Sequence, residues 1–162
     1  MEGCWPGENG SVKTALVGFG NPFHGDDAIG PMVARRIYES LPDRENIDLL
    51  ELSTSDFGVM EHLIGYQRAV IVDALVDEEA EVGTVKRVEL PECSDDGHVS
   101  PHTGGFSAAL RLARKLGLVV PAEIALYGIV IRAPQSFSDR LSAELEARLP
   151  EIVRTIATAQ FG

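Results

Sequence analysis

The sequence predicts an α/β fold: a three-layer α/β/α sandwich with a mostly parallel twisted sheet of about five strands. Short apolar runs of strand length alternate with segments whose apolar residues recur at helical spacing. Several of these runs are almost continuously apolar, which is typical of strands buried on both faces. The chain has 162 residues and no internal repeat or linker. We therefore expect one domain over 1–162, with 1–12 as a flexible lead-in.

The first half of the chain predicts the order β-α-β-α-β. The run "TALVG" at 14–18 predicts a buried strand that ends at glycine. Apolar residues at helical spacing predict a helix over 26–41, with Pro31 in its first turn, where a missing N–H costs little. The same patterns predict a strand at 47–53, a helix at 56–65 and a strand at 68–75.

The second half predicts the remaining elements around a long polar loop. The segment "GTVKRVEL" at 83–90 alternates strictly and predicts an edge or antiparallel strand. A polar stretch at 91–105 predicts a loop, and loops of that length are often functional. A helix at 106–117, a buried strand at 122–131 and a helix at about 138–160 follow.

The charge balance excludes several classes of partner. Lys and Arg total 14 against 25 Asp and Glu, so a nucleic-acid backbone would be repelled.

The start of the chain lacks the pattern of a signal peptide, and no apolar stretch has the length of a membrane span. We expect a cytoplasmic protein with no membrane partner. Cys4 and Cys93 form no C-x-x-C pattern and are expected to be reduced thiols.

The stretch "GFGNPFHGDDAIG" at 18–30 predicts a glycine-rich turn between a strand and a helix. A dinucleotide fingerprint needs a third glycine where Phe23 stands. A phosphate-binding P-loop needs Lys and Ser or Thr where Asp26 and Asp27 stand. A purely structural interpretation makes Asp26 a helix N-cap and Asp27 a first-turn acid that favours the helix dipole.

Two further polar residues favour a metal site over that structural interpretation. Asp73 stands at the carboxyl end of the third buried strand, the end where ligands bind in open α/β sheets. His102 follows Pro101 just before a helix, although a single loop histidine is often only solvated. Asp27, Asp73 and His102 together suit nickel, zinc or iron.

Other candidate site residues are supported less well by their positions in the sequence. His24 can reach the same crevice, whereas His62 on a helix and His98 in the polar loop are expected at the surface. A serine triad built on Ser100 lacks the strand-turn-helix elbow that exposes such a nucleophile.

Taken in order, "GFGNPFHGDDAIG", "VIVDAL" and "SPHTGG" resemble the hydrogenase maturation proteases, and the resemblance runs from about Ala15 onward. It implies an endopeptidase that removes the C-terminal extension of a nickel-iron hydrogenase large-subunit precursor after nickel insertion. The family's metal-contacting residues fall on Asp27, Asp73 and His102, and some members have glutamate at the position of Asp27. Asp26 matches a neighbouring acid for which we expect a capping role. Nickel would come with the substrate, without an organic cofactor, and we expect a monomer.

The resemblance leaves the chemistry open. The substrate's metal can polarise the scissile carbonyl or activate water, or an aspartate can act as general base on an ordinary water. An acyl-enzyme is disfavoured because Cys4 and Cys93 lie away from the three motifs. The alternative function is a non-catalytic metal-binding module for hydrogenase assembly on the same fold. A third possible function is that of a small-molecule hydrolase that uses the same crevice.

Overall fold

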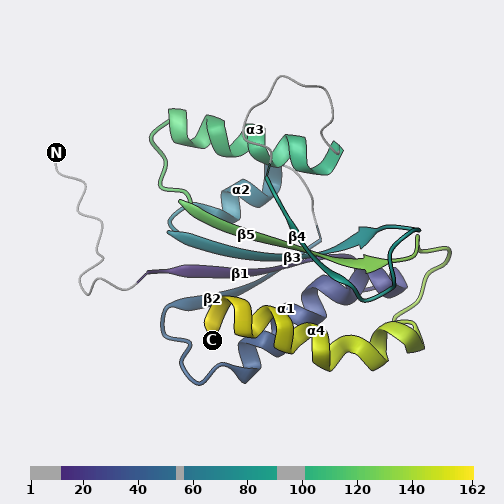
Figure 1. Cartoon of the computed structure of the whole chain (residues 1–162). Helices are drawn as coiled ribbons and strands as arrows, with labels where there is room; N and C mark the ends of the chain where they lie inside the picture. The colour runs from purple at the N-terminus through teal and green to yellow at the C-terminus, as the bar shows by residue number, and fades with distance from the viewer. Residues whose placement is uncertain (1–11, 54–56, 91–100) are drawn as a thin grey trace.

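A computed structural model describes residues 12–53, 57–90 and 101–162, and its strands form one sheet in the order β2-β1-β3-β5-β4 (Figure 1). All neighbouring strands pair in parallel except β4, which is antiparallel to β5 at the edge of the sheet. The strands are β1 (Thr14–Phe19), β2 (Ile47–Leu52), β3 (Arg68–Val76), β4 (Val85–Val88) and β5 (Glu123–Ile131). The predicted α/β fold class and the antiparallel edge strand are confirmed.

Helices cover both faces of the sheet (Figure 1). They are the 3₁₀ turn η1 (Gly25–Ala28) and the α-helices α1 (Ile29–Ser40), α2 (Phe57–Leu63), α3 (Pro101–Lys115) and α4 (Ala143–Phe161). The helices α1 and α4 contact each other on one face, and α2 and α3 on the other. Among the described residues, none of these helices is long and apolar enough to cross a membrane.

Two apolar clusters, one on each face of the sheet, form the core. Leu16 of β1 and Val72 of β3 pack with the α1 and α4 side chains. Val17 and Ile71, one residue away on the same strands, pack with α2 and α3. Successive side chains of a strand point to opposite faces, so a strand covered on both faces must be apolar at nearly every position. This geometry explains the continuous apolar runs.

Three α-helices start several residues away from their predicted positions. The helix predicted at 26–41 is divided into η1 and α1. The helix α3 begins at Pro101 rather than at 106, because proline is favoured in a first helical turn and the low helix propensity of Gly104 and Gly105 does not stop the helix there. The helix α4 begins at Ala143 rather than near 138, because Ser142 acts as its N-cap and accepts the Leu145 N–H at 3.4 Å.

Some sequence predictions fall on residues that the structure does not describe. The proposed lead-in at 1–12 falls almost wholly outside them, and Cys4, Cys93, His98 and Ser100 fall outside them entirely.

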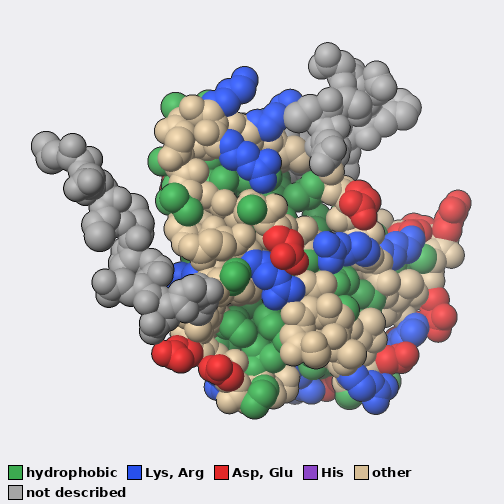
Figure 2. Space-filling view, turned by 60° about the vertical axis from the view of Figure 1, so that its left-hand side comes forward, with side chains coloured by type: hydrophobic (Ala, Val, Ile, Leu, Met, Phe, Trp, Pro, Cys, Tyr) green, Lys and Arg blue, Asp and Glu red, His purple; other side chains and the backbone are tan. Residues whose placement is uncertain are grey.

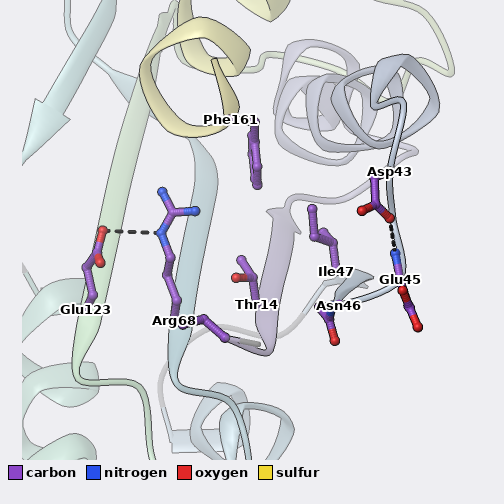
Figure 3. Close-up of a pocket in the computed structure, with 9 residues that line it drawn as sticks. Thr14, Asp43, Glu45, Asn46, Ile47, Arg68, Glu123 and Phe161 are labelled. Atoms are coloured by element: carbon purple, nitrogen blue, oxygen red, sulfur yellow. Dashed lines mark hydrogen bonds and ion pairs between the residues drawn. The ribbon is translucent and has the colours of Figure 1, made fainter. Parts of the chain in front are cut away.

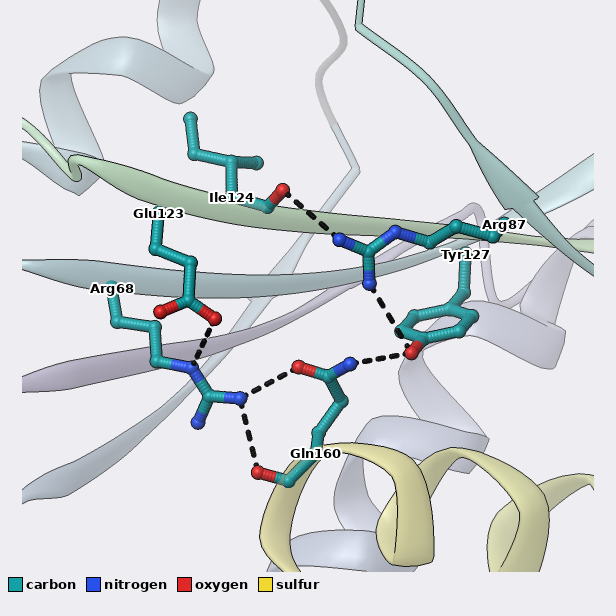
Figure 4. A network of polar contacts seen from close by, with 6 residues as sticks. All are labelled: Arg68, Arg87, Glu123, Ile124, Tyr127 and Gln160. Atoms are coloured by element: carbon teal, nitrogen blue, oxygen red, sulfur yellow. Dashed lines mark hydrogen bonds and ion pairs between the residues drawn. The ribbon is translucent and has the colours of Figure 1, made fainter.

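The end of α4 is attached to the sheet by a polar network at the amino ends of the strands (Figure 4). The Arg68 guanidinium donates to the Gln160 backbone oxygen at 3.0 Å and to its side-chain oxygen at 2.6 Å, and it pairs with Glu123 at 3.2 Å. The Gln160 amide in turn donates to the Tyr127 hydroxyl at 2.5 Å. Residues on β3, β5 and α4 are thereby joined, and this network fixes where α4 ends.

Candidate functional site

The strand order places a ligand-binding position between β1 and β3. The connection from β1 through α1 leads to β2 on one side of β1, whereas the connection from β2 through α2 leads to β3 on the other side. Such a reversal opens a crevice outside the carboxyl ends of the two strands, where open α/β sheets bind ligands. The segment 20–28 follows β1 at this point, and β3 carries Asp73 close to its own carboxyl end.

Glycines allow the turn after β1 to pack very closely. A methyl group on Gly18 would lie 2.5 Å from the Pro31 Cα, and one on Gly30 would lie 2.6 Å from the Val72 carbonyl oxygen. Gly20 has a φ of 153°, and a methyl group there would overlap the Asp27 carbonyl. The start of α1 can therefore rest directly on β1 and β3, and this contact sets where Asp27 lies.

Asp27 is held by the turn that precedes it. Its Oδ2 atom accepts the Asn21 backbone N–H at 2.8 Å, and the Asn21 side-chain oxygen accepts the Phe23 N–H at 2.9 Å. The side chain is half-buried. Asp27 thus lies within the first turn of the helical segment, as the structural interpretation expected, but its carboxylate also closes the glycine-rich turn.

Asp26 has a different role from its neighbour. The N-cap of η1 is His24, which makes no side-chain capping bond. The Asp26 Oδ1 atom instead accepts the Ser142 backbone N–H at 2.6 Å, 116 positions along the chain and at the start of α4. The interpretation of Asp26 as the N-cap of its own helix is wrong, because the carboxylate is directed to a different helix.

Asp73 lies just beyond the last β1–β3 pair, which joins Gly18 to Val72. On its other side it still pairs with Gly128 of β5. Strand alternation places Asp73 on the same face as Ile71, which packs against α2 and α3. The side chain is half-buried and its Oδ1 atom accepts the Ala74 N–H at 2.8 Å. Because η1 contacts β3, the elements that carry the two aspartates are neighbours.

His102 lies in the first turn of α3 and not in a loop. That helix covers the face of the sheet toward which Asp73 points, and it begins at the carboxyl edge of the strands (Figure 1). The His102 side chain lies outside the described residues. No three His, Cys, Asp or Glu side chains that the structure describes form a metal-binding group. The metal site of Asp27, Asp73 and His102 therefore stays a prediction.

Another aspartate at this edge has a structural partner. The Lys86 ammonium donates to the Asp77 Oδ2 atom at 2.6 Å, and the Glu79 and Ala80 N–H groups donate to its Oδ1 atom. These hydrogen bonds, that of Lys86 foremost, lower the pKa of Asp77 to about 2. Asp77 thus fixes the loop after β3, and it provides a natural control for Asp73.

Two exposed aromatic rings flank the turn, and sequence reasoning did not find them. Phe23 is 65% exposed and Phe137 is 81% exposed. Their loops are joined because the Gly25 N–H donates to the Ser138 oxygen at 2.8 Å and the Ser138 N–H donates to the Phe23 oxygen at 3.0 Å. The half-buried His24 packs edge-on against Phe137, with ring centroids 4.8 Å apart. The signal that was available is an aromatic residue within the polar stretch "APQSFSD".

A hollow of about 350 Å³ lies at the opposite edge of the sheet (Figure 3). It is lined by residues at the amino ends of the strands, among them Thr14, Ile47 and Arg68, together with Phe161 of α4. The Arg68 side chain there is already paired with Glu123. The hollow is therefore separate from the candidate site. His62, as predicted, is exposed on α2.

Comparison with known proteins decides the family. The family model described as "Hydrogenase maturation protease" matches residues 31–159. The chain belongs to the hydrogenase maturation protease family. Membership confirms the predicted family and the class of enzyme, a hydrolase of the endopeptidase type. Within this family match lie Asp73 and His102, whereas Asp27 lies four positions before it.

Individual proteins are similar to the chain in sequence or in fold. The chain is 28% identical over 123 residues to the coenzyme F420 hydrogenase subunit delta of Methanothermobacter thermautotrophicus, which covers 70% of this chain and 77% of that protein. Its fold is similar to that of the hydrogenase maturating endopeptidase HybD from E. coli, with a TM-score of 0.67, 21% identity and 91% of each chain covered. The maturation protease HycI from Thermococcus kodakarensis gives a TM-score of 0.67, 21% identity and 93% of each chain covered.

Proposed function

We propose that this hydrogenase maturation protease removes the C-terminal extension of a nickel-iron hydrogenase large-subunit precursor in the cytoplasm, after nickel has been inserted. Asp27, Asp73 and His102 would hold the nickel that the substrate carries. One observation supports this assignment above the others: two half-buried aspartates lie toward the carboxyl edge of adjacent parallel strands, Asp27 in η1 after β1 and Asp73 three residues before the end of β3, where the strand order reverses. Carboxylates and imidazole are suitable ligands for nickel.

The surroundings of the two aspartates support different roles for them. The Asp27 carboxylate is oriented by the Asn21 N–H, which suits a ligand whose position must be fixed before substrate arrives. Asp73 stands near the carboxyl end of β3 on the face that α3 covers, where it can bind metal or accept a proton from water. Either use requires a substrate that delivers its metal and its peptide bond to the same crevice.

Intact-mass spectrometry of the precursor tests the proposal. Nickel-loaded precursor would be incubated with the wild-type protein and with the Asp27→Asn and Asp73→Asn variants, and nickel-free precursor would be the substrate control. The matched enzyme control is Asp77→Asn, which changes an aspartate at the same edge that Lys86 already binds. We expect loss of a C-terminal peptide with wild-type protein and Asp77→Asn only, and only with nickel. Full cleavage by Asp73→Asn would contradict the assignment.

A non-catalytic role in hydrogenase assembly is the second candidate function. It is favoured by the similarity to a protein that is named a subunit of the coenzyme F420 hydrogenase rather than a protease. The same experiment distinguishes the two functions. Stable binding of the nickel-loaded precursor by wild-type protein, without any loss of mass, would support the assembly role and refute the protease.

A further inference from the structure

The described surface carries an apolar region far from the candidate site, around the carboxyl end of α3. Five side chains there are between 42% and 67% exposed: Ile64, Leu112, Leu116, Leu118 and Val119. Leu112 lies in the last turn of α3, and Leu116 directly follows the helix, with its N–H donating to the Leu112 oxygen at 2.9 Å. The Gly65 N–H donates to the Val119 oxygen at 2.8 Å, which brings the end of α2 against the segment after α3. These residues, with Arg111 and Lys115, are called the α3 patch below.

The α3 patch is cationic in an acidic protein. Residues 101–122 contain Arg111, Arg114 and Lys115 but no Asp or Glu, whereas the whole chain has a net charge of −11. Arg111 and Lys115 form no ion pair with any residue that the structure describes. In Figure 2, blue and green side chains lie together over the upper part of the molecule, whereas red and blue side chains are mixed lower down. Within this layer of the described structure, α3 contributes only cationic charged side chains, whereas α2 contributes the exposed Glu61.

The combination of charge and apolar surface selects one class of partner. An exposed apolar region of a few hundred Å² is often an interaction site. Charge complementarity indicates an acidic protein surface with apolar side chains at its centre. A symmetric contact with a second copy would bring Arg111 and Lys115 against their own equivalents. An anionic membrane would present negative charge to the whole facing side of a chain of net charge −11, whereas a protein surface can match the patch alone.

The position of the patch on α3 links it to the candidate site. The helix begins at the carboxyl edge, where His102 lies, and runs to the opposite edge of the sheet (Figure 1). At 1.5 Å per residue, Leu116 is about 20 Å from His102 along the helix axis. A folded protein whose C-terminal segment enters the crevice can contact this patch at the same time, whereas a few residues of peptide cannot span both positions.

We propose that the α3 patch is a docking surface for an acidic, apolar surface of the folded precursor, separate from the site where its C-terminal segment is cut. This inference rests on the proposed function for the identity of the partner. Docking at the patch would add affinity and correct orientation, and it would leave the chemistry at the aspartates unchanged.

Binding and cleavage of the full-length, nickel-loaded precursor test the docking surface. One variant reverses two charges (Arg111→Glu with Lys115→Glu), and another removes apolar surface (Leu112→Ser with Leu116→Ser). The control variant reverses two exposed charges on the other helical layer, Arg36→Glu with Arg154→Glu. Circular dichroism and thermal unfolding verify that all variants fold. The dissociation constant is measured by interferometry over a series of salt concentrations, and kcat and KM are measured by mass spectrometry.

We expect both patch variants to raise the dissociation constant and the KM for the precursor at least tenfold, with kcat unchanged. The dissociation constant of the charge-reversal variant should also depend less on salt concentration than that of wild-type protein. The control should differ from wild-type protein by less than threefold. Equal affinities in all variants would overturn the proposal. The proposal would also be overturned if the patch variants bound the precursor normally but lost self-association, because the occupant would then be a second copy. The same holds if they bound the precursor normally but lost binding to vesicles containing phosphatidylserine, because the occupant would then be a membrane. If wild-type protein binds the precursor without cleaving it, the protease assignment fails, and the binding data still test the docking surface.

Discussion

Replacement of Asp26 by alanine removes the carboxylate that accepts the Ser142 N–H at the start of α4, a bond of 2.6 Å. A hydrogen bond to a charged group contributes about 1.5–3 kcal/mol when it is shielded from water. A carboxylate at a helix N-terminus contributes about 0.3–1 kcal/mol. Because this bond lies at an exposed position, solvent screening reduces both contributions. We therefore expect Asp26→Ala to lower the free energy of unfolding by about 1–2 kcal/mol.

Urea denaturation and thermal unfolding measure this loss. For a domain of this size, each kcal/mol lowers the melting temperature by about 2–4 °C. Asp26→Asn retains an oxygen that can accept the Ser142 N–H, so it should lose less stability than the alanine variant. Precursor cleavage by folded Asp26→Asn should remain close to the wild-type rate, whereas Asp27→Asn should lose cleavage and keep its stability. The reasoning is refuted if Asp26→Ala unfolds like wild-type protein, or if folded Asp26→Asn is as inactive as Asp27→Asn.

Three further results are expected. The pKa of Asp77 is lowered to about 2 in the folded protein, below its value of about 4 in an unfolded chain. Its contribution to stability is therefore complete above pH 4 and is lost as the pH falls through 2. Between pH 7 and pH 2, the urea midpoint of Asp77→Asn should decline less steeply than that of wild-type protein, and parallel declines would contradict this. Gly30→Ala would place a methyl group 2.6 Å from the Val72 oxygen and should cost about 3 kcal/mol or more in urea denaturation, and a loss below 1 kcal/mol would refute the close packing. We expect the precursor to contact the exposed Phe137 ring beside the turn, so Phe137→Ala should raise the KM for the precursor roughly fivefold at constant kcat, and an unchanged KM would refute that contact.

The fold was predictable because its signals are local. Apolar runs and helical spacing reflect burial on two faces of a sheet or on one face of a helix, and both are readable within short windows. The position of Asp73 toward the carboxyl end of β3 followed from one such run, although the strand continues to Val76. The antiparallel edge strand also followed, because strict alternation indicates a strand with one solvent-exposed face.

The features that were missed depend on contacts between distant parts of the chain. The partner of Asp26 is Ser142, and no window of sequence contains both. The pairing of the turn near Phe23 with Ser138 is equally distant in sequence, so the aromatic pair beside the site was not predicted. The start of α3 was missed for a local reason: helix propensity is a weak guide, and two glycines near a helix start do not exclude a helix.

The bond between Asp26 and Ser142 has a consequence for synthesis on the ribosome. The crevice turn is translated early, but α4, whose N-cap residue Ser142 donates to the aspartate of the turn, follows every strand in sequence. The strand β5 must also enter between β3 and β4 before the sheet is complete. A nascent chain that ends before α4 would therefore lack the support for its glycine-rich turn. Maturation activity should accordingly appear only when α4 has left the exit tunnel and docked, so partly synthesised chains would not cut precursors.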